Sequence, residues 1–61
     1  MSQNSKEKAE EVLYNVECGQ RKLKNAMLMA ESINDLELKD RVAKDLAQVT
    51  VTVDWLRERL G

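Results

Sequence analysis

Proline, histidine and phenylalanine are absent from this 61-residue sequence, and cysteine, tryptophan and tyrosine occur once each. Histidine is the commonest general base and a principal metal ligand, so its absence removes the usual starting point for catalysis and for zinc binding. The single cysteine, Cys18, has neither a histidine to activate it nor a second cysteine to pair with. We therefore expect a protein that is not an enzyme and that has no metal site, no cofactor and no intrachain disulfide.

Long apolar segments and an excess of charge of one sign are also lacking. No apolar run approaches the roughly 20 residues that a membrane-spanning helix needs, and the opening segment MSQNSKEKAEE is polar where a signal peptide would be apolar. Ten Lys and Arg nearly balance eleven Asp and Glu, so the net charge of −1 gives no general attraction to nucleic acid or to anionic lipid. With the unpaired thiol, these features indicate a cytoplasmic protein, associated with membranes only indirectly.

A first helix is predicted over about residues 5–32. Asn4 and Glu7 have the Asn-x-x-Glu spacing of a capping box at its start. Apolar and small residues then recur at alternating steps of three and four, as in a helix that packs against another helix. These positions are Ala9, Val12, Val16, Gly19, Leu23, Ala26, Ala30 and Ile33. Leu13 and Met27 widen this apolar face, and the small residues Gly19, Ala26 and Ala30 are expected to let helix backbones approach closely in a helical bundle.

Residues 33–35 are predicted to form a turn, followed by a second helix over about residues 36–60. Ser32, Asn34 and Asp35 are short polar residues that end one helix and cap the next, and Asn34 with Glu37 repeats the Asn-x-x-Glu spacing. Gly61 stands where the second helix would end. The apolar face of this helix consists of Val42, Leu46, Val49, Val53, Leu56 and Leu60.

The segment QVTVTVDW, residues 48–55, alternates like a β-strand but is better explained as part of the second helix. Val49 and Val53 are four residues apart and continue its apolar face. No second strand candidate exists to satisfy the backbone hydrogen bonds of a strand. Val51 lies off that face, on a second apolar line that steps by four residues through Ala43, Ala47, Val51 and Trp55.

The predicted fold class is all-α, a single domain over residues 1–61 that forms an antiparallel two-helix hairpin. A chain this short builds a marginal core, and a helix that is apolar on two faces has more surface to bury than one partner helix covers. We expect the hairpins to self-associate, most simply as a homodimer that forms a four-helix bundle. The expected interface residues are Tyr14, Cys18, Met29, Ala47, Val51 and Trp55.

A non-enzymatic interaction or scaffolding role fits these features best, and two alternatives remain open. The first is an RNA-binding hairpin dimer of the plasmid copy-number regulator type, with phosphate contacts from Arg21, Lys22 and Lys24. Acidic residues are equally abundant, however, and no aromatic residue lies beside these three to stack on a base. The second is an accessory module that associates with a membrane protein or with lipid through the face of Val51 and Trp55.

The segments VLYNVECGQRKLK (12–24), DLELK (35–39) and VDWLRERL (53–60) resemble a small helical family of unknown function from endospore-forming bacteria, whose genes accompany the stage V sporulation A cluster. Family members usually continue into an acidic, proline-containing tail, and the alignment needs a few extra residues before the turn. The resemblance implies an accessory interaction module in a sporulating cell or spore, linked to spore membranes and heat resistance. The matching residues are Leu13, Val16, Gln20, Leu23, Asp35, Lys39, Asp54, Leu56 and Arg59.

Overall fold

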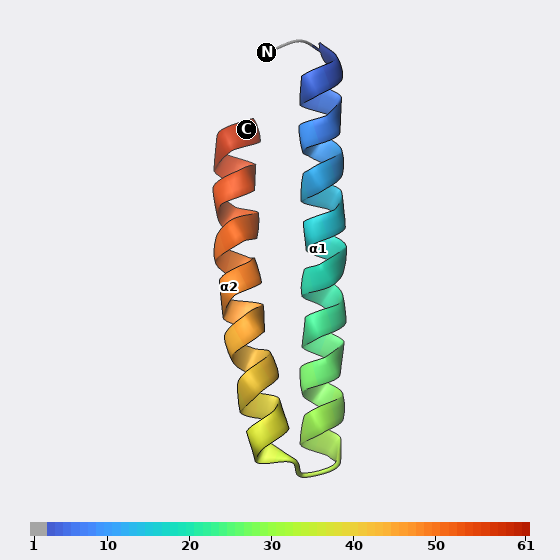
Figure 1. Cartoon of the computed structure of the whole chain (residues 1–61), viewed down its shortest axis with the longest axis vertical. Coiled ribbons are helices and arrows are strands. Elements are labelled where there is room, and N and C mark those ends of the chain that lie inside the picture. Colours follow the sequence, from blue (N-terminus) through green and yellow to red (C-terminus); the bar gives the residue numbers. More distant parts are fainter. Residues whose placement is uncertain (1–2) are drawn as a thin grey trace.

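The computed structural model describes residues 3–61, which form two α-helices joined by a short turn. Helix α1 spans Gln3–Ser32 and helix α2 spans Leu36–Leu60, and the two lie side by side in antiparallel directions (Figure 1). The prediction of an all-helical hairpin is confirmed. The hairpin is long and narrow, with dimensions of 48 × 14 × 12 Å.

The turn consists of two adjacent capping motifs, one that ends α1 and one that begins α2. Asn34 adopts the left-handed conformation, with φ of 59°, and its backbone N–H donates to the carbonyl of Glu31. The N–H of Asp35 reaches back to the carbonyl of Ala30 at 3.1 Å, which completes a Schellman ending of α1. The Asp35 carboxylate then accepts a hydrogen bond from the N–H of Leu38 at 3.0 Å and caps α2.

Two of the predicted caps are therefore wrong in detail. The N-cap of α2 is Asp35 and not Asn34, because Asn34 supplies the left-handed backbone that ends α1. Asn4 lies inside α1, which begins at Gln3, so it does not cap that helix. At the far end of α2, the N–H of Gly61 bonds to the carbonyl of Arg57 at 2.8 Å, as the position of the glycine suggested.

The segment QVTVTVDW is helical throughout, as predicted. Its β-branched threonines fit because their hydroxyls donate to carbonyls one turn earlier, Thr50 to Leu46 at 2.9 Å and Thr52 to Gln48 at 3.2 Å. Val53 is only 1% exposed while Val51 is 67% exposed. A strand would place these two valines on the same face, so their opposite burial follows from the helical period.

The predicted contact face of α2 is correct. On α1 one of the two predicted heptad rows, Ala9, Val16, Leu23 and Ala30, lies in the contact, and the other row is shifted by one position. Val12 and Ile33, predicted to pack against α2, are 52% and 68% exposed. Leu13 and Met27, predicted to widen the face, are half-buried, and Gln20, which was not predicted, is half-buried with them. The physical reason is side-chain size, because contact through the Leu13 row removes larger side chains from water than contact through the Val12 row would. The buried or half-buried residues of α1 that lie along this face by helical position are Ala9, Leu13, Val16, Gln20, Leu23, Met27 and Ala30.

Gly19 does not lie at a close contact between α1 and α2. A Cβ atom built on Gly19 would meet nothing within 4 Å, so this glycine is not needed for a close approach of α1 to α2. At this level of the hairpin Gln20, rather than Gly19, meets α2.

Candidate interaction surfaces

Large hydrophobic side chains remain exposed along the whole hairpin and on both helices. Their exposed fractions range from 46% to 69%, too high for residues that the contact between the two helices covers. They are Val12, Tyr14, Leu28, Met29, Ile33, Leu36, Leu38, Val51 and Trp55.

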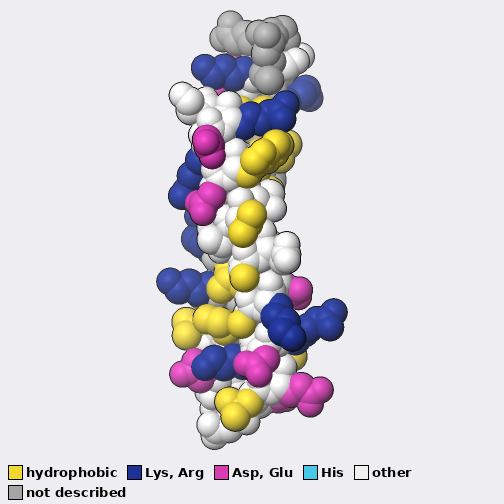
Figure 2. Space-filling view, turned by 90° about the vertical axis from the view of Figure 1, so that its left-hand side faces the viewer, with side chains coloured by type: hydrophobic (Ala, Val, Ile, Leu, Met, Phe, Trp, Pro, Cys, Tyr) yellow, Lys and Arg dark blue, Asp and Glu magenta, His cyan; other side chains and the backbone are white. Residues whose placement is uncertain are grey.

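The outer line of α2 consists of Ala43, Ala47, Val51 and Trp55. Trp55 is 55% exposed, and the guanidinium of Arg59 lies 5.2 Å from the centre of its ring. Each step of four residues turns the helix by about 40° beyond a full turn, so the line runs obliquely over the outer face of α2. Figure 2, which views the hairpin from the α2 side, shows hydrophobic side chains along such an oblique course.

The predicted interface also includes Tyr14, Cys18 and Met29 on α1. Tyr14 and Met29 are exposed, whereas Cys18 is half-buried and its Sγ accepts a hydrogen bond from Arg21 Nη2 at 3.2 Å. These three residues lie about 130° or more round α1 from its contact with α2, and the last three residues of the outer line lie equally far round α2. The hairpin therefore does not bring the two halves of the predicted interface together.

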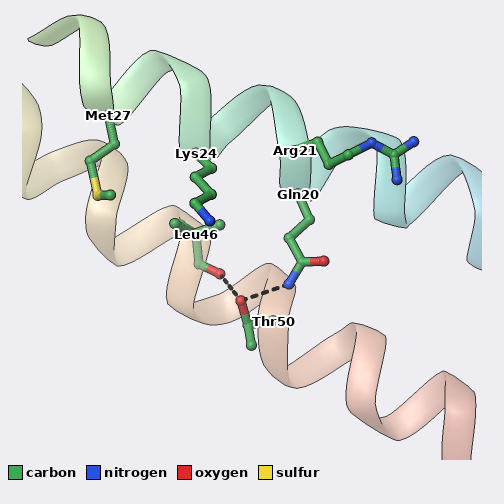
Figure 3. A pocket seen from close by; sticks show the side chains of 6 residues that line it. All are labelled: Gln20, Arg21, Lys24, Met27, Leu46 and Thr50. Atoms are coloured by element: carbon green, nitrogen blue, oxygen red, sulfur yellow. Dashed lines mark hydrogen bonds between the residues drawn. The ribbon is translucent and has the colours of Figure 1, made fainter.

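A groove between the helices, the central groove, has a volume of about 420 Å³ and is drawn in Figure 3. Gln20 Nε2 donates to Thr50 Oγ1 at 3.1 Å across it. In Figure 3, Lys24 extends toward α2, whereas Arg21 extends along α1 and away from Thr50. Lys22 is not part of the lining, so only two of the three predicted RNA contacts border this groove. The lining residues are Gln20, Arg21, Lys24, Met27, Leu46 and Thr50.

One edge of the contact between α1 and α2 carries ion pairs. Arg57 Nη2 lies 2.6 Å from Glu17 Oε2, and Lys39 Nζ lies 3.2 Å from Glu31 Oε2. The hydrogen bond and negative charge of Glu17 raise the pKa of Arg57 above its ordinary value. Glu17, Lys24 and Glu31 are seven residues apart, so they follow one side of α1. The two ion pairs link α1 directly to α2 along this edge, which is called the polar edge.

On the opposite edge of the contact, the α1 side is apolar and open. It consists of Val12, Gly19, Ala26 and Ile33, again at seven-residue intervals, and this row is called the α1 flank. By helical position, Gly19 and Ala26 lie on one side of the contact face of α1, and Glu17 with Lys24 lies on the other. The seven-residue spacing identified the α1 flank in the sequence, but the row was predicted to pack against α2.

The α1 flank ends in a shallow apolar hollow near the turn. The hollow has a volume of about 350 Å³, and Leu38 of α2, which is 46% exposed, forms part of its wall. Its lining is almost entirely apolar, so it offers a receptive surface for a hydrophobic side chain and few polar groups for a small ligand. The lining residues are Ala26, Met29, Ala30, Ser32, Ile33 and Leu38.

Within residues 3–61, no group of three or more cysteine or carboxylate side chains is arranged to hold a metal ion. Neither α1 nor α2, over the part described, has the length and apolar character required to cross a membrane. No protein-family model matches this chain, and searches of curated protein sequences and of solved structures also gave no match.

Proposed function

We propose that this protein is a non-enzymatic interaction module whose hairpins self-associate as a homodimer, forming a four-helix bundle. The observation that carries the proposal is the surface area of a single hairpin. The chain exposes 4970 Å² for a mass of 7.0 kDa, whereas a compact monomer of this mass exposes about 4000 Å². The excess, roughly 1000 Å², is close to the ~800 Å² that each partner buries in a stable interface.

The small interior of the hairpin supports the same proposal. Among the described residues, the buried hydrophobic side chains are Ala30, Val53 and Leu56. Chains of this length rarely obtain more than ~3–5 kcal/mol from a single core, and disulfides, metals or oligomerisation usually supplement it. One cysteine permits no intrachain disulfide, so association is the supplement that the exposed apolar surface favours.

Sedimentation equilibrium over a wide range of protein concentrations tests this function. We expect the mass to rise to twice 7.0 kDa and the thermal midpoint to increase with concentration, because dimerisation stabilises the folded chain by mass action. A folded monomer at every concentration, with a constant thermal midpoint, would contradict the proposal.

RNA binding is a second candidate, favoured by Arg21 and Lys24 beside the central groove. Phosphate contacts through these residues would give an affinity that falls steeply with salt. The variants Arg21→Glu and Lys24→Glu should then lose binding to a mixed-sequence RNA, measured by fluorescence anisotropy, while Lys22→Glu serves as the control outside the groove. No binding by the wild type at low salt would exclude this candidate and leave self-association unaffected.

The biological setting is a separate part of the proposal and rests on the sequence resemblance alone. We infer that the module acts in sporulation, as an accessory that contacts another protein. Mass spectrometry of purified spores of the encoding organism should detect the chain, and a deletion strain should form spores with reduced heat resistance. An encoding organism that forms no spores would overturn this setting without affecting the proposed self-association.

A further inference from the structure

We propose that two copies of the chain meet along their α1 flanks, with the two α1 helices antiparallel about a two-fold axis level with residues 22 and 23. This inference rests on the proposed self-association and specifies its surface and its orientation. The partner that covers the α1 flank is then a second copy of this chain, and the outer line of α2 stays outside the contact between the two α1 helices.

The order of side-chain sizes along the α1 flank fits a two-fold contact. From the N-terminal end the row reads large, small, small, large: Val12, Gly19, Ala26, Ile33. The same patch must complement itself in such an interface. An antiparallel arrangement places Val12 against Ile33 of the partner subunit and Gly19 against Ala26 of the partner subunit. Both pairs have their midpoint between residues 22 and 23, so one two-fold axis relates all four positions to those of the partner subunit.

This arrangement explains why a glycine occurs at position 19, in the middle of α1. Glycine inside a helix costs about 1 kcal/mol relative to alanine, and the space beside Gly19 is empty within the hairpin. A backbone that approaches from outside the hairpin fills that space. At the ends of the row, Val12 of the partner subunit comes to the apolar hollow beside Ile33 and Leu38, where a hydrophobic side chain fits.

The geometry of the alternatives favours the α1 flank over the other surfaces. A seven-residue row drifts by only about 20° per step, so the α1 flank turns by about 60° over its length of about 32 Å. The outer line turns by about 120° over a shorter length, so one straight helix cannot follow it. The polar edge would have to bury Glu17, Arg57 and Lys24, and burial of charges has a large desolvation penalty.

The variant Ile33→Lys tests the surface, and Val51→Lys on the outer line is its matched control, because the two side chains are 68% and 67% exposed in the hairpin. We expect Ile33→Lys to weaken the dimer at least about tenfold and Val51→Lys to change it less than about threefold, by sedimentation equilibrium. A wild-type dimer that Val51→Lys disrupts and Ile33→Lys does not would overturn this inference while self-association stands. A monomeric wild type would overturn both.

Cross-linking tests the orientation. In a Cys18→Ser background, single-cysteine chains carrying Val12→Cys or Ile33→Cys are mixed and oxidised, and the products are separated by mass. The antiparallel arrangement brings these two positions of different chains within disulfide reach, so mixed disulfides should exceed either homodisulfide. A predominance of Val12→Cys homodisulfides would indicate a parallel arrangement and would overturn the proposed axis.

Discussion

Gln20 and Thr50 are joined across the two helices by a side-chain hydrogen bond of 3.1 Å. The Thr50 hydroxyl accepts this bond and donates one of 2.9 Å to the carbonyl of Leu46, so it is satisfied on both sides. The pair lies midway along the hairpin, where the apolar contact of α1 is interrupted by a polar residue. Such a pair favours this register of α1 against α2, because a shift by one helical turn, about 5.4 Å, would carry the Thr50 hydroxyl out of reach of Gln20.

Replacing Thr50 by valine should measure how much the hydrogen bond between Gln20 and Thr50 contributes to stability. Thr50→Val removes the acceptor for Gln20, and we expect a loss of about 0.5–1.5 kcal/mol in the free energy of unfolding. Thr52→Val is the matched control, since the Thr52 hydroxyl bonds only within α2, to the carbonyl of Gln48. Urea denaturation at equal chain concentration gives both values. Equal effects of the two substitutions would show that the bond between the helices contributes nothing measurable.

A pair of valines checks the helical interpretation of QVTVTVDW in solution. Val53 is 1% exposed, so Val53→Ala should lower the free energy of unfolding by about 2 kcal/mol through lost burial and a small cavity. Val51 is 67% exposed, and Val51→Ala should be neutral or stabilising by a few tenths of a kcal/mol, because alanine has the higher helix propensity. Similar losses at both positions would contradict the opposite burial of these side chains.

The turn provides a third prediction. Asp35→Ala removes the cap of α2 and should destabilise the hairpin by about 1 kcal/mol. Asn34→Gly is the control one residue earlier, and glycine adopts the left-handed backbone of Asn34 without strain, so little change is expected. Thermal unfolding followed by circular dichroism compares the two. A larger loss for Asn34→Gly than for Asp35→Ala would reverse the roles assigned to these residues.

Gly19→Ala should act with opposite sign on the hairpin and on the dimer. In the Ile33→Lys background, where the proposed contact is removed, alanine should raise the helical content, because its propensity is better by about 1 kcal/mol and its Cβ meets open space. With Ile33 intact, the same Cβ lies where the second α1 approaches, and the dimer should weaken. A dimer strengthened by Gly19→Ala would argue against a close approach at this residue.

The two helices, the turn between them and the helical state of QVTVTVDW could be predicted because they depend on neighbouring residues. Apolar spacing, the absence of proline and the cluster of short polar residues near Asn34 act over one or two helical turns. The sequence alone did not decide which of Asn34 and Asp35 caps α2, because both residue types occur at either end of a helix. Their roles were decided by the hydrogen bonds of the folded turn.

The face of α1 that contacts α2 was decided only by the tertiary structure. Starting from Ala9, a step of three to Val12 and a step of four to Leu13 both continue a heptad pattern. The Val12 row has no polar residue, whereas the Leu13 row contains Gln20, so the pattern favoured the row that the hairpin leaves open. The hairpin buries the row that contains Leu13 and Met27, which have more apolar surface to remove from water than Gly19 and Ala26. The sequence by itself determined two helices and a hairpin, whereas packing between them decided which residues of α1 remain on the surface.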